Sequence, residues 1–132
     1  MRRLLVIEDG DEYEEFARLF LPRFHIRKAR SAAEALAALA QEPADALLID
    51  LRFDRAPTAA LLGDVAATAA RLFSGDQVRA LRYLQDQQGA LILEALRSAG
   101  HAMRALFVHD LPPPTPAEPA AALRGRGGGV RL

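Results

Sequence analysis

The sequence predicts an α/β domain built on a doubly wound parallel sheet of four to five strands. Two observations lead to this prediction. Continuous apolar runs of strand length recur along the chain, most clearly at 4–7 and 46–49, as expected for strands that are covered on both faces. Segments with helical spacing of apolar residues alternate with these runs through short connections, an order that favours right-handed parallel crossovers.

The first run, at 4–7, predicts a buried strand. Asp11, with Glu14 three residues later, resembles a capping box and predicts the start of a helix that Pro22 ends. The residues that keep helical spacing between these limits are Tyr13, Phe16, Ala17 and Phe20. We expect this helix to follow the first strand directly and to cover one face of the sheet.

A second strand and helix repeat this order. We expect a short strand at 24–27 and a helix whose start is marked by the capping-box pattern of Ser31 and Glu34. Pro43 ends that helix, and the apolar run at 46–51 predicts the third strand.

The next strand, expected at 105–108, is late in the sequence, so we expect a helical insertion at about 53–86. Two helical patterns lie before that strand. The second begins near Asp76, passes Gly89 and ends at Gly100, a typical position for a helix-ending glycine. The apolar stripe of the first pattern consists of Leu61, Leu62, Val65, Ala69, Leu72 and Phe73.

The end of the chain predicts a truncated fold. Residues of about 111–129 are rich in proline and glycine, which leaves 130–132 as the only remnant for a fifth strand. The length of 132 residues fits a single domain, 1–132.

Composition excludes several classes of protein. The 17 basic and 17 acidic residues cancel, so no global charge favours nucleic acid or an anionic membrane. The chain has no cysteine, which excludes disulfides and thiolate zinc sites. The start at 1–7 lacks the long apolar segment of a signal peptide, and no run approaches the ~20 residues of a membrane span. We therefore expect a cytoplasmic protein.

Carboxylates follow two of the expected strands at the point where each strand ends. Glu8 and Asp9 come directly after the first strand, and Asp50 lies at the end of the third. Parallel strands bring their carboxyl ends to one edge, so these like charges would repel one another unless a cation or a proton intervenes. Mg²⁺ prefers oxygen ligands, which makes all three residues candidate magnesium ligands. The alternative is that each carboxylate only begins a loop or caps the next helix.

Three segments resemble the receiver domain of bacterial two-component response regulators: residues 4–9, 29–36 and 43–51. The segments 88–97 and 104–108 are similar to the third helix and the fourth strand of that family. The resemblance implies a flavodoxin-like sheet with strand order 2-1-3-4-5.

The resemblance also implies a mechanism. Asp50 would be the phosphoacceptor, a carboxylate that takes a phosphoryl group from a partner histidine kinase. Glu8, Asp9 and Asp50 would hold the Mg²⁺ that offsets charge on that group. The function implied is that of a stand-alone domain in signal transduction that acts through protein–protein interaction, with a histidine kinase or a downstream effector as its partner.

The chain departs from the family pattern at the positions that sense the phosphoryl group. His109 stands where the family has a hydroxyl residue, and no lysine follows Lys28. Arg131 lies near the place of the missing lysine, but its planar guanidinium is no simple substitute for a compact ammonium. These departures predict an atypical or degenerate receiver.

Two other functions stay open. His109 and Asp110 could supply an acid, a base or a metal ligand, as expected of a small metal-dependent phosphoester-processing enzyme; a divergent receiver-like group is thought to process cyclic phosphates. The second of these hypotheses is a phosphorylation-independent interaction scaffold. The stripe at 61–73 either packs within the domain or forms a homodimer interface. One arginine–glycine stretch at 124–129 is a weak signal, so we do not expect nucleic-acid binding.

Overall fold

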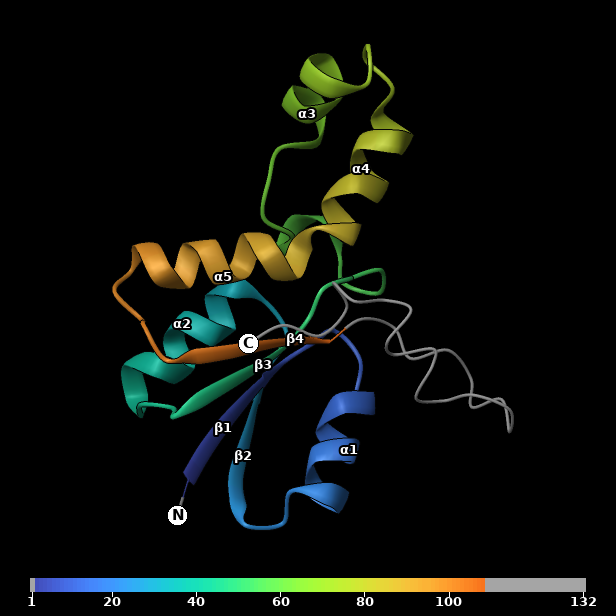
Figure 1. The fold of residues 1–132 in the computed structure, drawn as a ribbon. Helices are drawn as coiled ribbons and strands as arrows, with labels where there is room; N and C mark the ends of the chain where they lie inside the picture. The colour runs from blue at the N-terminus through green and yellow to red at the C-terminus, as the bar shows by residue number, and fades with distance from the viewer. Residues whose placement is uncertain (1, 109–132) are drawn as a thin grey trace, which may run out of the picture.

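The computed structural model describes residues 2–108 and has an α/β fold with a four-stranded, all-parallel sheet (Figure 1). Its strands stand in the order β2-β1-β3-β4. They are β1 (Arg2–Ile7), β2 (Phe24–Ala29), β3 (Ala46–Asp50) and β4 (Arg104–Val108). The predicted α/β class with a parallel sheet is therefore confirmed, whereas the five-strand order 2-1-3-4-5 stays a prediction. The fifth strand expected at 130–132 and the segment at 111–129 lie outside the described residues.

The register of the sheet brings the ends of its strands to one edge. Ile7 lies beside Ile49, and Ile49 lies beside Phe107. Glu8 and Asp50 each follow one residue later, so both stand at the carboxyl edge of adjacent strands, as the sequence predicted. This is the edge at which open α/β sheets carry their ligand sites.

Helices cover both faces of the sheet. α1 (Glu12–Phe20) packs on one face, whereas α2 (Ala32–Gln41) and α5 (Gln88–Ser98) cover the other (Figure 1). Strand side chains alternate between the two faces, so Val6 packs with the α1 side and Ile7 with the α2–α5 side. The buried positions on both faces of the central strands therefore take apolar residues, which explains the continuous runs at 4–7 and 46–49.

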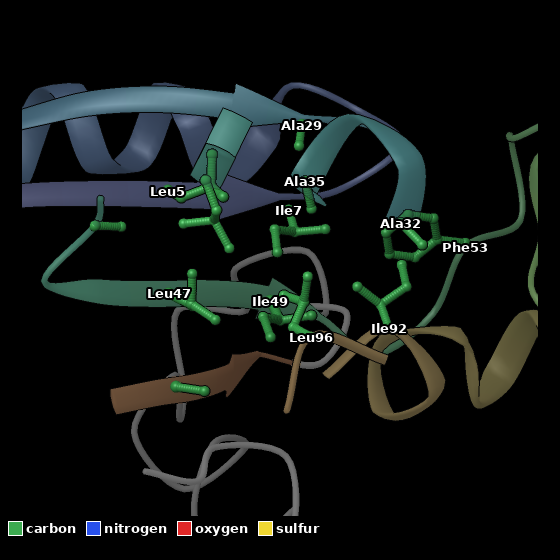
Figure 2. Packing of buried hydrophobic residues seen from close by; sticks show 13 residues of the cluster. Leu5, Ile7, Ala29, Ala32, Ala35, Leu47, Ile49, Phe53, Ile92 and Leu96 are labelled. Atoms are coloured by element: carbon green, nitrogen blue, oxygen red, sulfur yellow. The ribbon is translucent and has the colours of Figure 1, made fainter. Parts of the chain in front are cut away.

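The larger hydrophobic cluster lies between the sheet, α2 and α5 (Figure 2). Ile49 of β3 and both Ile92 and Leu96 of α5 are completely buried there. Phe53, which follows β3, is only 1% exposed and joins the same cluster. Burial of a side chain of this size contributes about 1.5–3 kcal/mol, so Phe53 fixes the start of the loop after β3.

The chain between β3 and α5 forms short helices. They are η1 (Thr58–Ala60), α3 (Val65–Leu72) and α4 (Gln77–Asp86). The predicted helix that includes Leu61 and Leu62 was wrong at its start, because both residues precede α3 and pack against the larger hydrophobic cluster. The Asp64 side chain accepts a hydrogen bond from the Ala67 amide (2.9 Å) and so sets the true start of α3. Figure 1 shows α3 and α4 standing away from the sheet as a hairpin.

The single helix predicted from Asp76 to Gly100 is instead two helices, α4 and α5, which meet at Gln87. The Gly89 amide donates a hydrogen bond to the Leu51 carbonyl (2.9 Å). A Cβ at position 89 would lie 2.3 Å from the Asp50 carbonyl oxygen. Only glycine allows this close approach, so the chain turns here and begins α5 against the end of β3.

The helices of residues 2–108 are short, and the longest, α5, has 11 residues. None of them is both long enough and apolar enough to cross a membrane.

Candidate functional site at the carboxyl edge of the sheet

Glu8, the first residue after β1, binds the start of α1. Its Oε1 accepts a hydrogen bond from the Tyr13 amide (3.0 Å) and its Oε2 accepts one from the Glu14 amide (2.7 Å). Asp11 precedes the helix but makes no side-chain capping bond, so Glu8 performs the capping that the sequence assigned to Asp11. A carboxylate at a helix N-terminus is stabilised by free N–H groups and by the helix dipole.

Burial is the chief cause that raises the pKa of Glu8 above its ordinary value of 4.5. The side chain is 0% exposed, and burial disfavours the charged form. The two amide hydrogen bonds and the nearby Lys28 ammonium act in the opposite direction. The carboxylate is thus buried at a cost that its donors only partly offset.

Lys28, near the end of β2, supplies a cation at this edge. Its side chain is only 11% exposed, and its Nζ lies 2.5 Å from Asp11 Oδ1, 3.6 Å from Glu14 Oε1 and 3.8 Å from Glu8 Oε2. It also donates a hydrogen bond to the Gly10 carbonyl. Lys28 holds the pKa of Asp11 below its usual range, and so does the Arg30 guanidinium, 2.8 Å away from Asp11 Oδ1. One ammonium therefore faces several carboxylates.

Asp9 binds the loop that follows β3. Its Oδ2 accepts hydrogen bonds from the Arg55 amide (2.6 Å) and the Ala56 amide (3.1 Å). The Arg55 side chain in turn lies 2.5 Å from Glu12 Oε1 and holds the pKa of Glu12 below its usual range. Asp9 and Arg55 together join the loop after β3 to the loop between β1 and α1.

Asp50 is the third predicted residue at this edge and is 7% exposed. Its Oδ1 accepts a hydrogen bond from the Arg52 amide (3.1 Å), which begins the turn after β3. The adjacent Leu51 amide donates to the Val108 carbonyl (2.9 Å), and Gly89 packs against the Asp50 backbone. Strand pairing and the start of α5 therefore hold Asp50 in place.

The three predicted carboxylates share an edge, but their side chains serve different loops. Within residues 2–108, no three His, Cys, Asp or Glu side chains are grouped so that they could hold a metal ion. Both oxygens of Glu8 already accept backbone N–H donors, and so does Oδ2 of Asp9. The side chains as arranged do not fit a three-carboxylate magnesium site. His109, Asp110 and Arg131 lie outside the described residues.

The sequence reasoning missed both Lys28 and Arg55. Lys28 had a detectable signal, because it precedes the last residue of β2 and pairs with Val6, two residues before Glu8. Strand alternation therefore places it on the face of Glu8. Arg55 had no comparable signal, since its position depends on how the loop after β3 folds.

Comparison with known proteins does not assign a family. No protein-family model matches the chain, and no curated protein matches it. The site must therefore be interpreted from its own geometry.

Proposed function

We propose that this chain is an atypical receiver-like domain that acts in signal transduction through protein–protein interaction and needs no metal-dependent phosphorylation. The main support for this proposal is the hydrogen bonding of the Glu8 and Asp9 carboxylates. Their carboxylates, which would hold Mg²⁺ in a phosphorylated receiver, accept backbone N–H donors from α1 and from the loop after β3.

Metal binding would have to break these contacts. If Glu8 turned toward a cation, the amides of Tyr13 and Glu14 would lose their acceptor, at a cost of about 1–3 kcal/mol for each buried donor. Mg²⁺ also requires nearly octahedral oxygen ligands and gives up its waters reluctantly. It therefore gains little from carboxylate oxygens that already accept hydrogen bonds from the backbone.

Side-chain cations already supply the charge that a metal would bring. Lys28 faces Glu8 and Asp11, and Arg55 is paired with Glu12. Because these cations are side chains of the protein itself, the negative charge at the carboxyl edge of the sheet is compensated without a ligand. This arrangement favours a fixed acidic edge over one that changes on phosphorylation.

Exposed apolar side chains support the proposal that the domain acts by binding another protein. α1 exposes Phe16 (44%), Leu19 (75%) and Phe20 (66%). Val78 (76%) and Tyr83 (40%) are exposed on α4. Clusters of large apolar side chains at the surface commonly mark contact sites for other proteins.

Incubation with acetyl phosphate and Mg²⁺, followed by intact-mass measurement, tests the proposal. We expect no gain of a phosphoryl group. A phosphoryl adduct on the wild type that the Asp50→Asn variant lacks would contradict the proposal and would make Asp50 a working phosphoacceptor.

A further inference from the structure

The α3–α4 hairpin carries a shallow groove of about 470 Å³. Phe73 and Tyr83 form its aromatic wall, with ring centroids 5.7 Å apart in an edge-to-face arrangement. The Arg79 guanidinium lies 5.4 Å from the centre of the Phe73 ring, so this wall also bears a positive charge. We call this surface the hairpin groove; its lining residues are Phe73, Val78, Arg79, Arg82, Tyr83 and Asp86.

The rim of the hairpin groove is positively charged. Arg79 and Arg82 are exposed at its rim. The acidic residue of the groove, Asp86, lies 3.2 Å from Arg52 and is thus partly compensated within the chain. The groove therefore fits a partner that combines acidic and large apolar side chains.

α1 presents such a surface. Phe16 and Phe20 lie with ring centroids 4.8 Å apart, and Leu19, beside them, is 75% exposed. Glu15 lies one turn before Leu19 and is also exposed, whereas Glu12 is paired with Arg55. We call four residues the α1 face: Glu15, Phe16, Leu19 and Phe20.

The two surfaces lie at opposite ends of the molecule. Figure 1 shows α1 on one side of the sheet and the α3–α4 hairpin projecting beyond the other. One copy therefore cannot bring its own α1 face to its own groove, but the face of one copy can reach the groove of another.

We propose that the hairpin groove binds the α1 face of a second copy of this chain, head to tail. Leu19 and Phe20 pack against Val78 and Tyr83, while Glu15 meets the arginines of the groove rim. A contact between two different surfaces leaves a free groove and a free α1 face at the ends of an open chain, so copies add until the assembly closes into a ring, of which a reciprocal dimer is the smallest. This proposal is independent of whether Asp50 is phosphorylated.

A pair of variants, each defective in one surface, tests the proposal by sedimentation. The groove variant is Arg79→Glu with Arg82→Glu, and the face variant is Leu19→Asp with Phe20→Asp. All four residues are exposed, so circular dichroism should show that both variants fold. The wild type should self-associate as its concentration rises, and each variant alone should stay monomeric.

The mixture of the two variants is the decisive sample. The groove variant keeps an intact α1 face and the face variant keeps an intact groove, so the mixture should form a one-to-one dimer and nothing larger. A wild type that stays monomeric at every concentration would overturn the proposal. Self-association of either variant alone would overturn it as well. So would a mixture of the two variants in which both stay monomeric.

Discussion

Glu8 Oε2 lies 2.7 Å from the backbone nitrogen of Glu14, so the carboxylate that ends β1 also anchors the first turn of α1. The strand, the helix and the acidic edge of the sheet are thereby joined through one buried side chain. Tyr13 supplies the second amide, 3.0 Å from Oε1. The consequences of this arrangement can be measured without any ligand.

Replacement of Glu8 by Ala should destabilise the fold by about 1–3 kcal/mol, because the buried amides of Tyr13 and Glu14 would lose their acceptors. Urea unfolding measures this change. Glu94→Ala is the matched control, since Glu94 is exposed on α5, and it should change stability by less than about 0.5 kcal/mol. Equal stabilities of Glu8→Ala and wild type would mean that Glu8 does not cap α1.

The raised pKa of Glu8 gives a pH dependence of definite sign. Between the ordinary value of 4.5 and the raised value, the folded state binds more protons than the unfolded state at this residue. The contribution of Glu8 to the free energy of unfolding should therefore fall as pH rises through this window. The lowered pKa values of Asp11 and Glu12 act in the opposite sense, since their contributions are lost as pH falls.

Comparison of wild type with Glu8→Gln isolates this effect, because Asp11 and Glu12 are present in both proteins. Urea unfolding at a series of pH values should show the wild type losing stability relative to the variant as pH rises through the window. A difference that stays constant with pH would contradict the raised pKa.

Lys28→Met should destabilise the fold by about 1–3 kcal/mol, because Glu8, Asp11 and Glu14 would lose their shared cation. The effect is smaller than for a fully buried pair, since Asp11 is exposed and solvent screens it. Arg30→Met is the control: Arg30 also pairs with Asp11 but is itself exposed, so its loss should matter much less.

A direct view of Lys28 is available because it is the only lysine of the chain. A sample labelled at the lysine side-chain nitrogen gives a single NMR signal for this ammonium. Slow exchange of its protons with water is expected from its burial, and Asp11→Asn should shift the signal. A signal typical of a freely solvated lysine would show that Lys28 does not pair with the carboxylates of the acidic edge.

Gly89→Ala should destabilise the protein by about 1–3 kcal/mol, although alanine is the better helix former. The added Cβ would lie 2.3 Å from the Asp50 carbonyl oxygen and 2.7 Å from the Leu51 Cα, so the backbone would have to move. Ser98→Ala, at the exposed end of α5, is the control and should be neutral or slightly stabilising. Thermal unfolding distinguishes the two, and an equally stable Gly89→Ala variant would show that the approach of α5 to β3 is not tight.

Strands and their shared edge could be predicted from the sequence because they depend on local pattern. The two central strands, β1 and β3, contain continuous apolar runs at 4–7 and 46–49, and the position of Glu8 and Asp50 follows from where these runs end. The capping role of Ser31 was also confirmed, since its Oγ accepts a hydrogen bond from the Glu34 amide (3.1 Å).

The direction of each side chain at the edge could not be predicted, because it depends on which partner lies within reach after folding. The capping-box pattern at Asp11 was misleading for this reason, since the buried Glu8 takes the helix amides instead. Helical spacing likewise did not separate Phe16 from Tyr13 and Ala17, although only the latter two are buried residues of α1.

The central claim, that backbone donors and side-chain cations hold the acidic edge, is tested most directly by a titration with Mg²⁺ and beryllofluoride, a mimic of the phosphoryl group. Amide chemical shifts of Glu8, Asp9 and Asp50 report on binding. We expect no saturable shift of these amides at millimolar Mg²⁺, with or without beryllofluoride. Saturable shifts at all three residues that disappear in Asp50→Asn would contradict it.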